Sequence, residues 1–114
     1  MERGILAVNT AKLKPGVTLE LAHEAWDKAY SSEQFIKVYP KGEFPSTADT
    51  IGENNALIGL AIDEHANRLV AVCAIDNLVK GTGGAAIQSM NIALGLAENT
   101  GLTAISLAKN GAKK

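Results

Sequence analysis

Two runs of apolar residues separated by a short polar segment constrain the fold of this 114-residue chain more than any other feature. The runs are residues 56–62 and 69–75, and the polar segment between them is 63–68. Run length, β-branched content and the polar connection favour two antiparallel strands joined as a hairpin. Because both runs are almost continuously apolar, both faces of the hairpin need cover from other elements or from a second subunit.

A strand and a helix are predicted upstream of the hairpin. Residues 5–14 begin apolar and become polar, which is typical of a strand leaving the core, and Pro15-Gly16 ends it. Thr18 then stands at a helix N-cap position. Apolar residues between 19 and 30 recur at three- and four-residue steps, which predicts an amphipathic helix of about three turns.

The remaining segments complete the expected architecture. Residues 35–39 form a short strand, and residues 40–55, rich in Pro, Gly, Ser, Thr and Asn, are expected to be an exposed excursion. A second helix with small residues in its first turns follows residues 81–84 and ends at Gly95. A short strand at 102–107 precedes a polar tail. We expect an α+β fold: a mainly antiparallel sheet with two helices available to cover the hairpin.

Composition narrows the class of protein. Apolar residues make up 46% and charged residues 20%, as in a folded globular domain, and the length suits one domain. The 11 basic and 12 acidic residues nearly cancel, which argues against nucleic acid or a polybasic membrane patch as a partner. No apolar run approaches the roughly 20 residues of a membrane span, and the first residues lack a secretion signal. We therefore expect a cytoplasmic protein.

The reactive side chains do not form a recognisable active site. A single cysteine excludes an internal disulfide and a zinc site built from several thiolates. Cys73 lies within an apolar strand and is predicted to be a buried, inert thiol. His23 and His65 are predicted to be solvated surface residues, and neither has a Ser or Cys at a spacing typical of catalysis. We assign no catalytic residue and no metal site.

The glycine-rich segment from Gly81 to Ala86 is the strongest candidate for a ligand contact. It fits the pattern G-x-G-x-x-A, but only 28 residues follow it, too few for the rest of a dinucleotide-binding domain. Lys80 precedes the first glycine, which excludes a P-loop. Two interpretations remain: a turn that permits close helix packing, or a loop that abuts a cofactor bound elsewhere. Asp76 and Asn77 are placed to cap or orient this segment.

Residues 74–91, AIDNLVKGTGGAAIQSMN, closely resemble the C-terminal signature of the N-acetyl-gamma-glutamyl-phosphate reductase family. The resemblance continues through residues 94–102, and upstream it includes RGIL at 3–6 and KLKPGV at 12–17. It covers nearly the whole chain, to about Leu102. Where the family usually has Gly-Ser-Asn before the hairpin, this chain has Gly-Glu-Asn at 52–54.

The resemblance implies an oxidoreductase of arginine biosynthesis. Members of this family reduce an acyl phosphate to N-acetylglutamate semialdehyde with NADPH, through a cysteine thioester and a histidine acid/base, and resemble aspartate-semialdehyde dehydrogenases. This chain resembles only the C-terminal third. It lacks the NADP-binding fingerprint and both catalytic motifs, so we expect a fragment that is inactive as an isolated chain.

The resemblance also divides the chain by role. It implies part of a catalytic and dimerisation domain at 1–80, a helix that packs on the NADP-binding domain plus a short strand at 81–108, and a tail at 109–114. It implies NADP contacts at Gly81, Gly83, Gln88 and Asn91, and a homo-oligomer formed through the sheet. Two alternatives stay open: a non-enzymatic dimerising module, and a fragment that complements a separate N-terminal chain.

Overall fold

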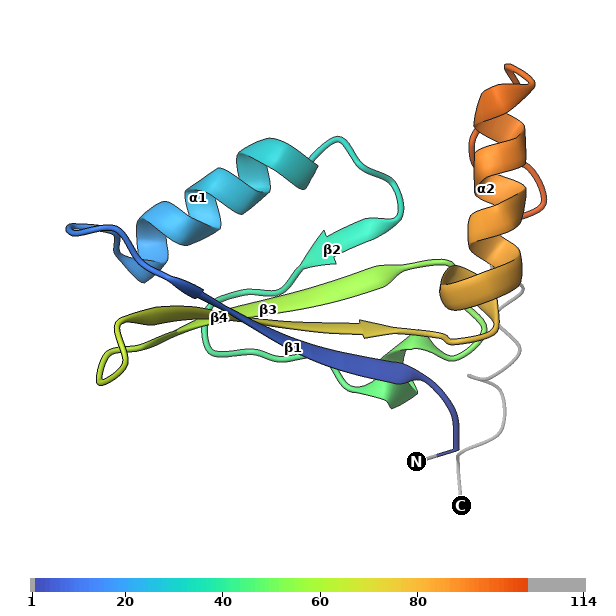
Figure 1. Cartoon of the computed structure of the whole chain (residues 1–114). Coiled ribbons are helices and arrows are strands. Elements are labelled where there is room, and N and C mark those ends of the chain that lie inside the picture. The colour runs from blue at the N-terminus through green and yellow to red at the C-terminus, as the bar shows by residue number, and fades with distance from the viewer. Residues whose placement is uncertain (1, 103–114) are drawn as a thin grey trace.

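One four-stranded sheet, in the order β1-β4-β3-β2, organises the chain in the computed structural model, which describes residues 2–102 (Figure 1). The expected short strand at 102–107 therefore lies almost wholly outside the described residues. The strands are β1 (Ile5–Lys12), β2 (Ile36–Val38), β3 (Ala56–Asp63) and β4 (Arg68–Ile75). The helices are α1 (Leu19–Tyr30), the 3₁₀ turn η1 (Thr47–Thr50), the π-helical turn η2 (Val79–Gly83) and α2 (Gly84–Ala93).

The predicted hairpin is confirmed and forms the centre of the sheet. β3 and β4 pair antiparallel from Ala56 opposite Ile75 to Asp63 opposite Arg68. β1 pairs antiparallel with the other side of β4. β2 pairs parallel with β3, so the α+β class is confirmed but the sheet is mixed rather than purely antiparallel. β2 and β3 run in the same direction because the 39–55 connection returns the chain to the end of the sheet at which β2 starts.

Helix α1 covers one face of the sheet (Figure 1). Thr18 caps it as predicted: its Oγ1 accepts a hydrogen bond from the backbone N–H of Leu21 at 3.3 Å. Trp26 and Tyr30 lie on the side that faces the sheet, with ring centroids 5.5 Å apart. This helix packs over β2 and β3, and it leaves the β1 side of the same face open.

The 40–55 segment covers part of the opposite face, which corrects the expectation of an exposed excursion. Thr50 is fully buried, and Asn54 is 2% exposed. A Cβ at Gly59 would lie only 2.8 Å from both the backbone oxygen of Glu43 and Cδ1 of Phe44. The segment therefore runs directly against β3, where glycine alone leaves room for it. Its polar composition reflects turns and caps rather than solvent exposure throughout.

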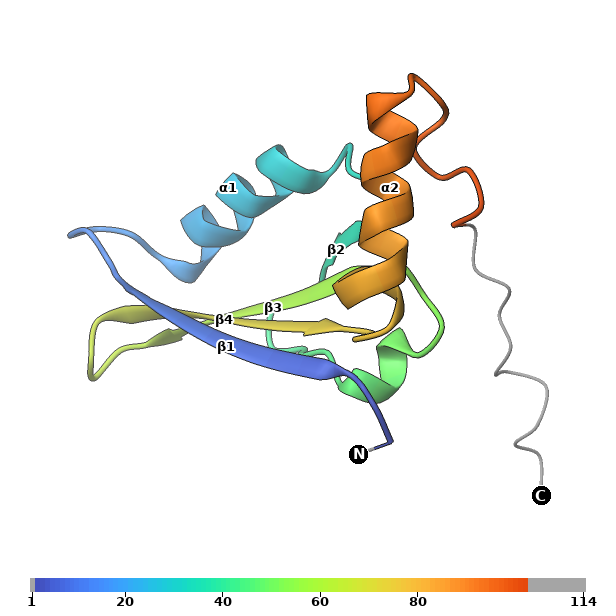
Figure 2. The same cartoon turned by 45° about the vertical axis from the view of Figure 1, so that its right-hand side comes forward.

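Helix α2 stands upright at one end of the sheet instead of lying on a face (Figures 1 and 2). The expectation that both helices cover the hairpin therefore holds for α1 and is wrong for α2. Its apolar side chains stay exposed to solvent; they are Ile87, Met90 and Ile92, together with Leu94 just after the helix.

Within residues 2–102, no helix combines the length and apolar character needed to cross a bilayer.

Candidate functional site

Asp76, at the end of β4, joins three parts of the chain. Its buried carboxylate accepts hydrogen bonds from the N–H groups of Leu78 (2.8 Å), Val79 (3.1 Å) and Gly52 (2.7 Å), and from Nη2 of Arg3 (2.7 Å). Burial opposes ionisation, but these donors outweigh it and hold the pKa of Asp76 below its usual value. The carboxylate therefore caps the first turn of η2 and anchors the segments before β1 and β3.

Asn77 supports the same junction. Its Oδ1 accepts a hydrogen bond from the backbone N–H of Gly4 at 2.8 Å, and its backbone oxygen accepts one from Oγ1 of Thr82 at 2.7 Å. Asp76 and Asn77 thus cap and orient the glycine-rich segment, as predicted from their position after an apolar strand.

The glycine-rich segment is a helical turn rather than an open loop. The N–H of Gly81 donates to the backbone oxygen of Asp76 at 2.8 Å, and the N–H of Gly83 donates to that of Leu78 at 3.0 Å. Gly83 has helical dihedral angles, so η2 runs directly into α2. Because these N–H groups are already bonded within the turn, they do not form a cradle for a pyrophosphate.

Close packing explains the glycine at position 84. A Cβ there would overlap Oδ1 of Asn54 and lie 2.7 Å from the backbone oxygen of Val79. The segment before β3 therefore presses against the first turn of α2. Close helix packing, one of the two interpretations left open by the sequence, is therefore present at Gly84.

Five polar side chains from five segments meet beside this contact, and we call them the polar cluster. Oε1 of Gln88 accepts hydrogen bonds from Nδ2 of Asn54 at 3.0 Å and from Nζ of Lys80 at 2.7 Å. Nε2 of Gln88 donates to Oε1 of Glu98 at 2.5 Å. Nε2 of Gln34 donates to the other oxygen of Glu98 at 3.1 Å. The cluster ties α2 to the core and to the segment after it.

The charged members of the polar cluster determine which way the Gln88 amide points. An ammonium group only donates hydrogen bonds and a carboxylate only accepts them. The oxygen of Gln88 must therefore face Lys80, and its nitrogen must face Glu98. Both lone pairs of the oxygen are used, whereas one of the two N–H groups is used by the described contacts. Gln88 can offer a ligand a donor but not an acceptor.

Lys80 lies between the ring of Phe35 and the other members of the polar cluster. Its Nζ lies 5.5 Å from the ring centroid of Phe35, in addition to its bond with Gln88. Burial lowers the pKa of Lys80, and the charge of Glu98 partly offsets that effect. The sequence alone did not single out Lys80, Asn54 or Glu98 as members of one site, because the three residues are far apart along the chain.

The four predicted site residues occupy different environments. Gly81 and Gly83 are exposed on η2, and Gln88 is half-buried in the polar cluster. Asn91 is 1% exposed, and its Nδ2 donates to the backbone oxygens of Glu98 at 3.0 Å and Thr100 at 2.9 Å. Asn91 thus holds the segment that carries Glu98, and through Glu98 it is connected to Gln88.

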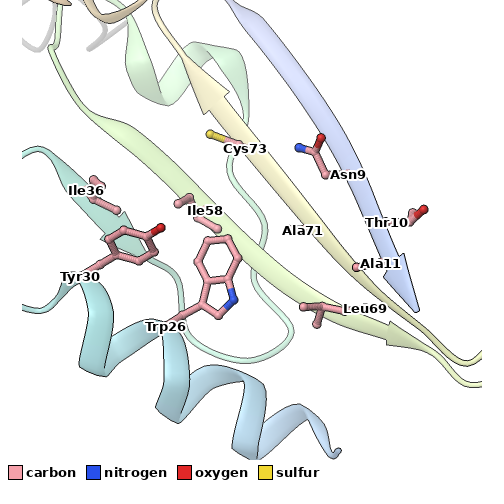
Figure 3. A pocket seen from close by; sticks show the side chains of 10 residues that line it. All are labelled: Asn9, Thr10, Ala11, Trp26, Tyr30, Ile36, Ile58, Leu69, Ala71 and Cys73. Carbon is pink, nitrogen blue, oxygen red and sulfur yellow. The ribbon is translucent and has the colours of Figure 1, made fainter. Parts of the chain in front are cut away.

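An apolar hollow of about 360 Å³ lies between α1 and the sheet (Figure 3). Trp26 and Tyr30 of α1 face Ile58 and Cys73 across it. Cys73 is half-buried rather than fully buried, and burial raises the pKa of its thiol. The thiolate is therefore disfavoured, which agrees with the expectation of an inert cysteine.

The histidines do not form a site with this thiol. His65 is exposed in the β3–β4 turn as predicted, but His23 is only 8% exposed, and its Nε2 is buried without a hydrogen-bond partner. The prediction of a solvated His23 is wrong because the packed side of α1 is wider than the apolar residues alone indicate. Within residues 2–102, no three His, Cys, Asp or Glu side chains are grouped to hold a metal ion.

Comparison with known families agrees with this architecture. Residues 1–77 match the family described as "Semialdehyde dehydrogenase, dimerisation domain". Since the match extends over more than half of the sequence, the chain belongs to the semialdehyde dehydrogenase dimerisation-domain family.

The similar curated proteins are longer and share one name, N-acetyl-gamma-glutamyl-phosphate reductase. The protein of Leifsonia xyli is 58% identical over 103 residues, which is 90% of this chain and 30% of that protein. The protein of Arthrobacter sp. strain FB24 is 54% identical over 102 residues, with the same shares. The protein of Streptomyces coelicolor is 53% identical over 108 residues, 95% of this chain and 32% of that protein. The chain thus spans about a third of the length of these relatives, in their C-terminal part, and the resemblance seen in the sequence is confirmed.

Proposed function

We propose that this chain is the C-terminal portion of an N-acetyl-gamma-glutamyl-phosphate reductase of arginine biosynthesis. The reaction is the NADPH-dependent reduction of an acyl phosphate to N-acetylglutamate semialdehyde. The observation that carries this proposal is 58% identity, over 90% of the chain, to a protein of that name. The chain contributes the sheet through which two subunits associate and the η2–α2 unit that faces the cofactor.

The isolated chain is inactive in this proposal. Acyl transfer to an enzyme requires an accessible nucleophile with an adjacent base. Cys73 has a raised pKa and lies half-buried among apolar side chains. His23 is buried on α1, and His65 is exposed at the β3–β4 turn, so neither histidine serves it as a base. The nucleophile and the acid/base group come from the portion of the reductase that this chain does not match.

The helix of the 81–108 segment, α2, packs against the NADP-binding domain in the complete enzyme. The exposed apolar side chains of α2 support this role, because the helix stands clear of the sheet that would otherwise bury them (Figure 2). Ile87 and Met90 are 38% and 49% exposed. An apolar surface on a projecting helix is typical of a contact with another domain.

The residues of this unit fit the nicotinamide part of NADP better than its phosphates. Gly81 and Gly83 have no free N–H aimed outward, but without side chains they let a flat ring approach the backbone. Gln88 offers one N–H, which suits an acceptor such as a carboxamide oxygen. Asn91 acts indirectly, by holding the Glu98 segment. When bound, NADPH supplies the hydride, and this chain's residues position it.

The homo-oligomer forms through the sheet in this proposal. Assignment of residues 1–77 to a dimerisation-domain family supports self-association. On the face opposite α1, Val70 and Val72 of β4 are only half-buried, and Leu6 and Val8 of β1 are exposed. A second sheet packed on this face would remove these side chains from water.

Reconstitution tests the proposal. The chain is purified alone and together with the part of the Leifsonia xyli reductase that it does not match, and NADPH oxidation with the acyl phosphate is followed. We expect activity only for the combination. If the two parts associate but remain inactive, the reductase proposal fails, and the non-enzymatic dimerising module becomes the better description. Activity of the combination would also support the alternative of a naturally complementing fragment.

A further inference from the structure

Lys80 has surroundings that differ from those of the other lysines in residues 2–102. The other five lysines are exposed to solvent, whereas Lys80 is half-buried. Lys41, for example, forms an ion pair with Glu20 at 2.6 Å. Within the described part of the chain, Lys80 forms no ion pair, and its Nζ donates instead to the neutral amide oxygen of Gln88 at 2.7 Å. Its amino group is thus partly removed from water without a bonded carboxylate to hold the proton.

The surroundings of Nζ favour the neutral amine more than water does. Burial lowers the pKa of Lys80, although the charge of Glu98 and the ring of Phe35 act in the opposite direction. Both oxygens of Glu98 already accept hydrogen bonds from Gln34 and Gln88, so its carboxylate acts on Lys80 only across a distance. A larger fraction of Lys80 than of an exposed lysine is therefore the free amine near neutral pH.

The polar cluster leaves the lone pair of this amine unused. Gln88 presents its oxygen to Nζ, because its nitrogen is bonded to Glu98, so it accepts a hydrogen bond from Lys80 and donates none. Among the described residues, no group donates a hydrogen bond to Nζ. Because Lys80 is only half-buried, small solutes reach its side chain from solvent. A desolvated lysine amine with an unused lone pair is a nucleophile.

We propose that Nζ of Lys80 is a site of acylation by acyl phosphates, and the relevance of this class of reagent rests on the proposed function, whose substrate belongs to it. The lone pair of Nζ attacks the carbonyl carbon, a C–N amide bond forms, and the bond from that carbon to the phosphate oxygen breaks. Inorganic phosphate leaves with the bonding electrons, the amine gives a proton to water, and nothing is oxidised or reduced. The product is a stable amide, so the step is stoichiometric and differs from the catalytic acyl transfer that the isolated chain does not perform.

Acylation alters the unit that faces the cofactor in the proposed function. The amide keeps one N–H for the oxygen of Gln88 but carries no charge, so Glu98 loses its nearby cation. The modification thus connects exposure to an acyl phosphate with the charge balance around Gln88.

Chemical acetylation of the 114-residue chain tests the inference. The probe is acetyl phosphate, a small acyl phosphate, at about pH 8, and peptide mass spectrometry follows the acetylation rate of each lysine. Lys37 is the internal control, because it is exposed on β2. We expect Lys80 to react about threefold or more faster than Lys37 in the folded chain, and the two rates to be equal in urea. A rate at Lys80 equal to or below that at Lys37 in the folded chain would overturn the inference, and so would a ratio that persists in urea.

The pH dependence tests whether the free amine is the cause. The ratio of the Lys80 rate to the Lys37 rate should fall as the pH rises from about 8 to about 11, because exposed lysines then also lose their proton. A constant ratio would show that access to Nζ, rather than its protonation state, favours Lys80, and it would overturn the inference. The measurement uses neither NADPH nor the rest of the reductase, so the inference can fail while the reductase proposal stands.

A substitution at Glu98 provides the second test. Glu98→Gln should raise the acetylation rate at Lys80 by about twofold or more, since it removes the charge that favours the ammonium form. Glu33→Gln is the matched control, because Glu33 is exposed, and it should leave the rate unchanged. Circular dichroism establishes that each variant folds. An unchanged or lower rate at Lys80 in folded Glu98→Gln would overturn the inference, because the reactivity would then not depend on the polar cluster.

Discussion

Nδ2 of Asn54 donates a hydrogen bond to Oε1 of Gln88 at 3.0 Å, which connects the segment before β3 to the middle of α2. The two residues are 34 positions apart, and both belong to the polar cluster. Helix α2 projects from the sheet and has little other contact with it (Figure 1). The orientation of α2 therefore depends on this polar contact more than on apolar packing.

Removal of the Asn54 side chain should destabilise the chain. Asn54→Ala leaves a cavity beside Gly84 and takes one donor from Gln88, so we expect a loss of about 1–3 kcal/mol in the free energy of unfolding, measured with urea. Asn9→Ala is the control, because Asn9 is exposed on β1, and its effect should stay within about 0.5 kcal/mol. Equal effects of the two substitutions would contradict the role given to Asn54.

Alanine substitutions at neighbouring glycines should have opposite signs. Gly84→Ala forces a methyl group onto Oδ1 of Asn54 and to 2.7 Å from the backbone oxygen of Val79, and should cost about 1–3 kcal/mol. Gly83→Ala meets only the backbone oxygen of Leu78 at 3.4 Å, in helical geometry, and should be neutral or stabilising by up to about 1 kcal/mol. Thermal unfolding of both variants checks this difference, and a neutral Gly84→Ala would rule out the close contact.

Asp76 should make the stability depend on acid pH. Its pKa is lower in the folded chain than its ordinary value of 3.8, so its ionised form stabilises the folded state above that value. This contribution is lost as the pH falls through the lower, folded-state pKa. Urea unfolding is measured from about pH 7 to pH 2. Asp76→Asn should reduce the decrease in the free energy of unfolding that acid causes over this range. At neutral pH the same substitution should lower the free energy of unfolding by about 1.5–3 kcal/mol. One carboxylate oxygen that accepts hydrogen bonds is then replaced by an amide NH₂, which cannot accept them. If the free energy of unfolding of Asp76→Asn depended on pH as it does in the original chain, Asp76 would not be the source of the acid-induced loss.

Gln88 should contribute to NADPH affinity in addition to the hydrogen bonds by which it holds α2. In the reconstituted reductase, Gln88→Ala should raise the Kd for NADPH by about 5- to 30-fold, as expected for loss of one hydrogen bond to a ligand. Gln34→Ala is the matched control, because Gln34 also bonds Glu98 but lies before β2. Its Kd should be unchanged. An unchanged Kd for Gln88→Ala, with an intact melting transition, would exclude Gln88 as a cofactor contact.

The thiol of Cys73 should react slowly with alkylating reagents. Burial raises its pKa, so the thiolate fraction at about pH 8 is smaller than in an unfolded chain. We expect modification to be about tenfold or more slower in the folded chain than in urea, as followed by mass spectrometry. Equal rates in the two states would show that the hollow between α1 and the sheet gives the thiol no protection.

Local patterns in the sequence predicted most elements correctly. The hairpin, the strand at 5–12, the capped helix at 19–30 and the helical run after residue 84 are all present. Each depends on neighbouring residues: apolar periodicity, a capping threonine, or a proline and glycine that end a strand. The cap formed by Asp76 and Asn77 was predicted for the same reason, since those residues stand beside the turn they bond.

The errors and omissions all involve contacts between distant residues. The sequence did not predict that β2 pairs parallel with β3, that Glu43 and Phe44 pack against Gly59, or that His23 is buried. It also did not predict that α2 stands off the sheet, or that Lys80, Gln88 and Glu98 form one cluster. Each of these features depends on where the segments meet in space. Periodicity and composition carry no information about such meetings.

The sequence by itself therefore determined the family, the order of the elements and the amphipathic character of each one, because those properties depend on residue type and local spacing. Only the tertiary structure decided which backbone N–H groups the glycine turn still has free, which way the Gln88 amide points, and which lysine lies half-buried beside Phe35. These features arise from hydrogen bonds and packing between residues far apart in the chain, where one-dimensional order carries little information about distance.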